Sequence, residues 1–99
     1  MKRKVKHQIT FQDKVLGVVC RIPFGQVRSY AWVARKAGSP KAVRAVGQTL
    51  KKNPYPLIVP CHRVIKSDGT LGGYAGGKKM KENLLNLERF LAEKLKVEP

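Results

Sequence analysis

Residues 53–77 restrict the possible folds more than any other part of this sequence. The segment reads NPYPLIVPCHRVIKSDGTLGGYAGG, with three prolines near its start (Pro54, Pro56, Pro60) and four glycines near its end. Each proline lacks a backbone donor and is incompatible with a helix interior, so the first part must run extended. The glycines predict a loop whose backbone can approach another group closely. Helices must therefore lie on either side of this segment.

Before this segment, apolar residues recur at helical spacing. Spacings of three and four predict an amphipathic helix over residues 11–22, with Thr10 and Asp13 as a weakened capping box at its start. Ser29 can cap a second helix over residues 30–37, which Gly38 ends. Ser39 and the following proline predict the start of a third helix over residues 40–51.

The third predicted helix has an apolar side and a basic side. Val43, Val46 and Leu50 are expected to be buried, whereas cations recur on another side. Two short helices joined by a glycine turn, the second with a basic stripe, are typical of a helix-turn-helix. An ordinary helical hairpin with a solvated charged face is the alternative, and composition alone does not separate the two.

After the prolines, the pattern predicts two short strands and a final helix. The turn at residues 67–70 predicts a small, wing-like β-hairpin between Val64-Ile65 and Leu71. Residues 78–96 predict a long helix that packs through one apolar face, made of Met80, Leu84, Leu87, Leu91 and Leu95. The expected fold is mainly α with a small β-hairpin: a winged helix-turn-helix-like single domain over residues 10–99, preceded by a flexible basic arm over residues 1–9.

Charge is distributed unevenly along the chain. Of 21 Lys and Arg and 6 Asp and Glu in 99 residues, residues 1–66 hold 15 basic residues and a single acid, Asp13. The positive charge of residues 1–66 favours a polyanionic partner. Nucleic acid is the first candidate partner and a membrane surface the second. No segment predicts a transmembrane helix or a secretory signal. Two cysteines far apart are too few for a disulfide scaffold and favour a reduced, intracellular protein.

The sequence PCHRV, residues 60–64, is the candidate reactive site. A positive environment lowers the pKa of a cysteine, so Cys61 is a candidate nucleophile, and His62 could take its proton directly or through one water. Glu82, near the start of the last helix, is a plausible carboxylate to orient His62. A buried, inert cysteine beside a surface histidine is the simpler interpretation of an isolated Cys-His pair. The cysteines and histidines lack the paired spacing of a metal site, so no metal is expected.

Several longer motifs carry a resemblance to a known family. The runs IPFGQVRSY (22–30), SPKAVRAVGQTLKKNP (39–54), PLIVPCHRVIKSDGTLGGYAGG (56–77) and KENLL (81–85) resemble the DNA-binding, catalytic domain of the O6-alkylguanine-DNA alkyltransferases, also called methylated-DNA–protein-cysteine methyltransferases. The resemblance covers about residues 10–90, and PCHRV followed by a GYxGG loop is its most specific part.

The resemblance implies a role for individual residues in alkyl transfer. Cys61 matches the acceptor that attacks the alkyl carbon on guanine O6, His62 the base and Glu82 the carboxylate that orients it. Asn53 matches the residue that organises the loop leading to the site. Tyr30 matches the proton donor to the departing guanine. No cofactor is implied.

The resemblance also implies a DNA-binding surface on a monomer. Arg44 matches the residue that fills the duplex after nucleotide flipping, and the third helix would enter the minor groove, where Ala42 and Ala45 allow close approach. Lys41 and Lys51 would contact phosphates. Gly73 and Tyr74 match the loop that walls the base pocket, and the backbone carbonyl of Val64 would accept from the guanine amino group. The implied partner is double-stranded DNA containing O6-alkylguanine.

Two other functions remain open at this point. Alkyltransferase-like proteins share this minimal domain and flip alkylguanines without transfer, but they typically have tryptophan in place of the acceptor cysteine. A winged-helix transcription factor or architectural DNA binder would also fit the charge and the helix-turn-helix. Members of the family commonly carry an additional N-terminal domain, which the 99 residues do not include.

Overall fold

A computed structural model describes residues 9–95 of the chain. The predicted basic arm therefore lies almost entirely outside the described residues. The order of elements is α1 (Phe11–Val19), β1 (Arg28–Ser29), α2 (Tyr30–Lys36), α3 (Val43–Lys51), the 3-10 helix η1 (Cys61–Arg63), β2 (Val64–Ile65) and α4 (Lys78–Leu95). Four α-helices with a two-stranded sheet confirm a mainly α, single-domain fold.

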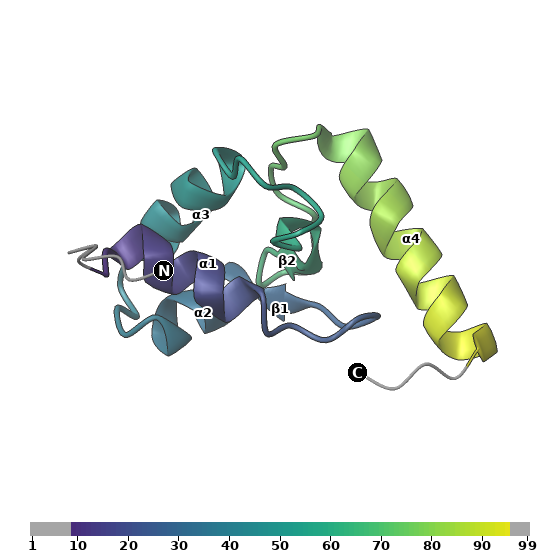
Figure 1. Ribbon diagram of the computed structural model, residues 1–99, viewed down its shortest axis with the longest axis horizontal. Helices are drawn as coiled ribbons and strands as arrows, with labels where there is room; N and C mark the ends of the chain where they lie inside the picture. The colour runs from purple at the N-terminus through teal and green to yellow at the C-terminus, as the bar shows by residue number, and fades with distance from the viewer. Residues whose placement is uncertain (1–8, 96–99) are drawn as a thin grey trace, which may run out of the picture.

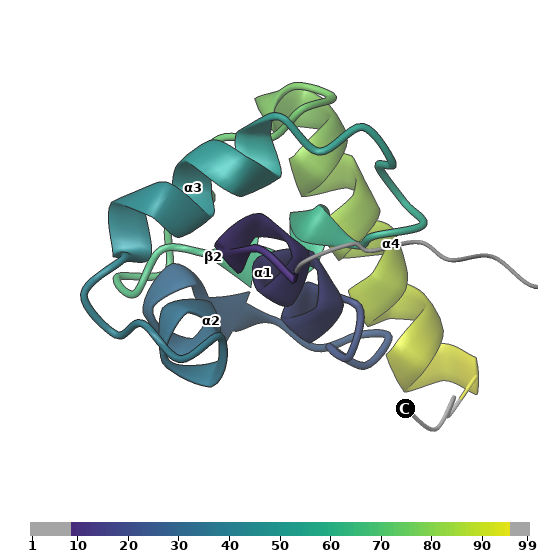
Figure 2. The ribbon, with the colours of Figure 1, turned by 60° about the vertical axis from the view of Figure 1, so that its left-hand side comes forward.

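The helices α1, α2 and α3 pack around a valine-rich core, with η1 and β2 between them and α4 (Figures 1 and 2). Val15, Val33 and Val46, one from each of the three helices, are completely buried. Both α1 and α2 start at a side-chain cap, since Thr10 accepts from the backbone N–H of Asp13 and Ser29 from that of Trp32. Thr10 and Asp13 form a full capping box.

The third helix begins three residues later than predicted. Ser39 does not cap it; instead the Ser39 carbonyl accepts from the N–H of Ala42 at 2.9 Å, which closes a turn through Pro40. The helix then starts at Val43, with Ala42 as an N-cap residue that makes no side-chain hydrogen bond. Val46 and Leu50 are buried as expected, but Val43 is 38% exposed because it lies in this first, solvent-facing turn.

The predicted hairpin was wrong in its strand pairing. The turn at residues 67–70 is present, and the N–H of Lys66 donates to the Thr70 carbonyl. However, β2 pairs in parallel with β1, with Arg28 opposite Val64 and Ser29 opposite Ile65. A turn in the sequence indicates that the chain reverses, but it does not show which strand pairs with which. Here β1, which directly precedes α2, is the partner of β2. This pairing fixes PCHRV beside the start of α2.

The last helix turns the predicted apolar face to the protein only in part: Leu84 packs against the core and Leu91 is half-buried. Met80, Leu87 and Leu95 are 49%, 53% and 64% exposed. The buried positions of α4 are Lys81, Leu85 and Glu88. The two polar residues face η1 and the loop before α4, so α4 covers the reactive segment with charged side chains. No helix in the described part of the chain is long and apolar enough to cross a membrane.

Candidate active site and DNA-facing surface

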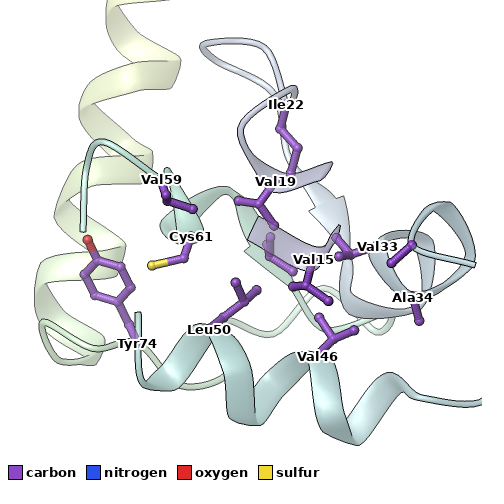
Figure 3. Packing of buried hydrophobic residues seen from close by; sticks show 12 residues of the cluster. Val15, Val19, Ile22, Val33, Ala34, Val46, Leu50, Val59, Cys61 and Tyr74 are labelled. Atoms are coloured by element: carbon purple, nitrogen blue, oxygen red, sulfur yellow. The ribbon is translucent and has the colours of Figure 1, made fainter. Parts of the chain in front are cut away.

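Cys61 lies in the core at the first position of η1. It is 2% exposed, and its sulfur points toward the ring of Tyr74 (Figure 3). The preceding segment does not run extended as predicted but forms a turn, in which the N–H of Val59 donates to the Tyr55 carbonyl at 2.9 Å and Leu57 has a φ of +81°. The side-chain amide of Asn53, itself 4% exposed, donates to the Cys61 sulfur at 3.3 Å and to the Val59 carbonyl at 3.1 Å. One buried amide thus contacts both the reactive sulfur and the backbone that precedes it.

His62 and Glu88 form a buried, hydrogen-bonded pair next to Cys61. Nε2 of His62 lies 2.6 Å from a Glu88 carboxylate oxygen, and both residues are buried. The guanidinium of Arg63 contacts the same carboxylate at 2.9 and 3.0 Å. Burial raises the pKa of Glu88, but the hydrogen bonds and charges of Arg63 and His62 outweigh burial and lower that pKa overall. Glu88 is therefore a carboxylate at neutral pH.

The ionised state of Glu88 determines the tautomer of His62. Because a carboxylate can only accept, Nε2 must carry the proton of this hydrogen bond. Nδ1 is then the ring nitrogen with a free lone pair, and it is buried without a hydrogen-bond partner among the described residues. Nδ1 is therefore the nitrogen through which His62 can accept a proton while Nε2 stays hydrogen-bonded to Glu88.

Glu82 does not perform the role predicted for it. Its carboxylate lies 3.7 Å from Lys79 on an exposed part of α4, and the His62 contact belongs to Glu88. The two glutamates are six residues apart and project from different sides of the helix. No sequence signal singles out Glu88, because charged residues at i and i+7, as Lys81 and Glu88 are, usually form a solvated helix face.

Lys81 is the other residue of the site that sequence reasoning missed. Its side chain is completely buried, and its ammonium donates to the hydroxyl of Tyr30 at 3.2 Å and to the carbonyls of Leu71 and Gly73. Burial lowers the pKa of Lys81 to about 8, although the nearby Cys61 acts in the opposite direction. The ammonium of Lys81 therefore connects α4 to Tyr30 and to the glycine loop, residues 72–77.

The protonation of Cys61 is set by opposing effects. Burial raises the pKa of the thiol above its usual value, while the Asn53 hydrogen bond and the charge of Lys81 lower it without cancelling the effect of burial. The resting group is accordingly a thiol at neutral pH, and it needs a base to become a nucleophile. His62 is the base beside it in the chain.

Tyr30 and the glycine loop form one wall of the site. The Tyr30 hydroxyl donates to the Gly73 carbonyl at 3.3 Å, and burial together with Cys61 raises the pKa of Tyr30. Gly72 has a φ of +76°, and a Cβ there would lie 2.7 Å from the Tyr30 hydroxyl oxygen, so only glycine fits. Tyr74 is buried, and its ring meets the His62 ring edge-on at 6.3 Å.

A separate, solvent-open cavity of about 640 Å³ lies along α3. Tyr30, Arg44, Lys51 and Gly73 are among the residues that line it. Lys41 and Ala45 are exposed, Ala42 is half-buried, and Val64 is buried in β2 away from this surface. Cys61 does not line this cavity, but Tyr30 and the glycine loop belong to both places. The two parts of the predicted site thus share a wall.

Together these features define a helix-turn-helix domain that holds a buried cysteine between a histidine–glutamate pair and a tyrosine–lysine pair. Among the described residues, no group of three His, Cys, Asp or Glu side chains is placed to hold a metal ion. Residues 10–90 match the family described as 6-O-methylguanine DNA methyltransferase, DNA binding domain. The chain belongs to this family.

Known members of this family are similar to the chain over about half of their own length. The constitutive methylated-DNA–protein-cysteine methyltransferase of Bacillus subtilis (strain 168) is 58% identical over 81 residues, which are 81% of this chain and 49% of that protein. Mycobacterium tuberculosis OGT in complex with DNA superposes with a TM-score of 0.80 at 45% identity, covering 85% of this chain and 52% of that one. The chain therefore spans about half the length of these relatives.

A third similar structure is shorter. S. pombe Atl1, solved in complex with damaged DNA containing O6-carboxymethylguanine, has a TM-score of 0.72 and 38% identity. The match covers 83% of this chain and 78% of that chain. The match thus covers about half of some similar proteins and about three quarters of another.

Proposed function

We propose that this chain repairs DNA by transferring an alkyl group from O6 of guanine to the sulfur of Cys61, once per molecule. The observation that carries the proposal is the buried arrangement of Cys61, His62 and Glu88, because it provides a nucleophile, a base and an orienting carboxylate in one place. The methyltransferase names of the relatives support the same reaction.

The chemical step follows from the positions of these groups. Nδ1 of His62 takes the Cys61 proton, directly or through one water, and Glu88 stabilises the imidazolium that forms. The thiolate attacks the alkyl carbon, the new S–C bond replaces the C–O bond, and the electron pair passes into the purine. Tyr30 supplies the purine with a proton and is reprotonated from the imidazolium. The net change moves one proton from Cys61 to guanine.

The neighbouring residues make this charge movement possible. Lys81 lies 3.2 Å from the Tyr30 hydroxyl, so its ammonium stabilises negative charge that develops on that oxygen. Asn53 holds the sulfur through its amide. A thioether has no route back to a thiol within this site, so the protein is consumed by one reaction.

Substrate entry requires the base to leave the duplex. Guanine O6 is inside the double helix, and flipping a nucleotide costs a few kcal/mol. We infer that α3 lies in the minor groove of double-stranded DNA, that Arg44 occupies the gap, and that Lys41 and Lys51 contact phosphates, since Arg44, Lys51 and Tyr30 line one cavity. The flipped base would then pass Gly73 and Tyr74, with the Val64 carbonyl as an acceptor for its amino group.

Access to the sulfur depends on movement of the chain around it. Cys61 is 2% exposed, so a base cannot reach it in the conformation described. Leu57 is 61% exposed and has a φ of +81°, which is a costly backbone conformation for a branched residue. Two segments beside the sulfur can therefore move apart. One contains Leu57, and the other is the glycine loop. The proposed active form is a monomer, inside the cell and bound to DNA.

Mass spectrometry of the intact protein tests the proposed transfer. After incubation with a duplex containing one O6-methylguanine, the protein should gain one methyl group in place of the thiol hydrogen. Cys61→Ser should show no gain, and an unmodified duplex should leave the mass unchanged. Because Cys20 is exposed and free, Cys20→Ser should still be methylated, which assigns the modification to Cys61.

Lesion recognition without transfer is the second candidate function. The observation that favours it is the similarity to Atl1, of which this domain covers 78%. Tight, lesion-dependent binding with an unchanged protein mass would support recognition and contradict transfer. Equal affinity for modified and unmodified duplexes would contradict both functions and support an architectural DNA binder.

A further inference from the structure

A second basic hollow lies between the end of α1 and one side of α2. Its volume is about 330 Å³, and it is open to solvent. Its lining combines three cations with apolar groups and contains no acid: Val18, Arg21, Pro23, Arg28, Trp32 and Lys36. None of these residues has a role in the proposed alkyl transfer.

Two of the three cations of the hollow lie close to the same aromatic ring. The Arg28 guanidinium lies 5.4 Å and the Lys36 ammonium 5.8 Å from the centre of the Trp32 ring. The guanidinium of Arg28 donates to the Val27 carbonyl at 2.8 Å and to the Gln26 side-chain oxygen at 2.7 Å. Both acceptors are neutral, so the positive charge is held in place without being neutralised. Two like charges beside one ring repel each other, and a bound anion would relieve that repulsion.

The hollow faces away from the cavity along α3. Tyr30 lines the α3 cavity, whereas Trp32 and Lys36 line the hollow. Positions two residues apart on a helix differ by about 200°, while positions four apart share a face. Tyr30 and Trp32 therefore project from opposite sides of α2. A duplex bound along α3 leaves the hollow free for another ligand.

We propose that this hollow binds a single-stranded nucleic-acid segment through its phosphates, separately from the duplex at α3. A guanidinium matches the geometry of a phosphate, and cations placed beside an aromatic side chain are the usual means of binding single strands without sequence preference. Trp32 is half-buried, so part of its indole can contact a sugar or base. An acidic peptide would use the cations but not the ring, which favours nucleic acid.

The fluorescence of Trp32 tests the proposal directly, because Trp32 is the only tryptophan in the sequence. Tetrathymidylate added at low salt, with an unmodified duplex already saturating the protein, should change the Trp32 emission with a saturable dependence on concentration. In the double variant Arg21→Glu/Lys36→Glu, the affinity for tetrathymidylate should fall at least about tenfold, and it should weaken steeply with salt.

A matched control separates the hollow from general charge. Lys78→Glu/Lys94→Glu changes the net charge by the same amount, at two exposed α4 positions that do not line the hollow. It should bind tetrathymidylate like the wild type. An absent response of Trp32, or equal losses in the two variants, would overturn the proposal. So would equally tight binding of tetraglutamate, which would assign the hollow to an acidic protein segment.

The proposed alkyl transfer is measured in the same proteins. At saturating duplex, both variants should methylate Cys61 at the same rate, because none of the four lysine and arginine positions belongs to the reactive site. Intact transfer also shows that each variant is folded. Loss of strand binding with normal transfer supports the proposal, and a wild type that fails to transfer but binds the strand contradicts only the repair function.

Discussion

α3 and α4 are both amphipathic helices, but they bury faces of opposite character. α3 buries Val46 and Leu50 and leaves Arg44 exposed, as its apolar spacing predicts. α4 buries Lys81 and Glu88 along with Leu85, while Leu87 and Phe90 are 53% and 55% exposed. α3 follows the hydrophobic pattern, whereas α4, which covers the reactive cysteine, follows it only in part.

The difference shows what determines the orientation of each helix. Burying a charge costs free energy unless the charge is paired and hydrogen-bonded. Lys81 has three oxygen partners, and Glu88 has His62 and Arg63, so on α4 this cost is offset by groups that lie outside the helix. A buried polar network therefore decides which face of α4 packs inward. Substitutions in α3 and α4 test that explanation.

Replacing Glu88 should have the largest effect. Glu88→Gln keeps the size of the side chain but removes the charge that holds the His62 tautomer and stabilises the imidazolium. The rate of methyl transfer should fall on the order of 10³-fold, within the usual contribution of an oriented base. The measurement is the single-turnover rate with a duplex containing O6-methylguanine.

Glu82→Gln is the matched control for this substitution. Glu82 lies on the same helix and is exposed, so its transfer rate should stay within about twofold of the wild type. A larger loss in Glu82→Gln than in Glu88→Gln would contradict the assignment of the orienting carboxylate. Thermal unfolding of both variants should accompany the rates, because Glu88 also pairs with Arg63.

The apolar residues of the two helices should differ in their contribution to stability. Leu50→Ala removes a side chain that is 3% exposed and should lower the free energy of unfolding by about 3 kcal/mol. Leu87→Ala removes one that is 53% exposed and should change it by less than about 0.5 kcal/mol. Urea unfolding followed by circular dichroism measures both. Equal losses would mean that the apolar stripe of α4 is buried after all.

Lys81 should shift the pH dependence of transfer. Lys81→Met removes a positive charge that lowers the pKa of Cys61, so the thiol should ionise at higher pH. The rate at pH 7.5 should fall about tenfold, which corresponds to about 1.4 kcal/mol in the barrier, and should partly recover in alkaline buffer. Lys79→Met, on the exposed side of α4, should leave the rate profile between pH 6 and 10 unchanged.

Lys81 should also make the free energy of unfolding depend on pH. The pKa of Lys81 is about 8 in the folded protein and 10.5 when unfolded, so between these values the unfolded chain binds more protons. Stability from this group therefore rises as pH increases from about 8 to 10.5. Lys81→Met should lack this rise, which the difference in unfolding free energy between the two proteins isolates. A constant difference across this range would contradict the shifted pKa.

The sequence was sufficient for local structure and for the reactive segment, and insufficient where partners are remote. Caps and spacing predicted α1 and α2, and the family resemblance placed Cys61 and His62 together with Asn53. The start of α3 was missed because Pro40 entered a turn rather than the first helical position. The sequence analysis named Glu82 and did not identify Glu88, because helical spacing cannot show which acid meets a histidine 20 or more residues earlier in the chain. The pairing of β2 with β1 likewise depends on tertiary contacts.

The smallest effect concerns the exposed cations of α3. Lys51 lines the cavity beside Arg44. It is exposed to solvent, in contrast to the buried Lys81. Lys51→Ala should weaken duplex binding only moderately, but it should reduce the slope of log affinity against log salt by about 1, since one phosphate contact fewer releases one counterion fewer. Lys94→Ala, at the far end of α4, should leave the slope unchanged. A slope that is insensitive to Lys51 would remove α3 from the DNA-binding surface, although the buried network of α4 would be unaffected.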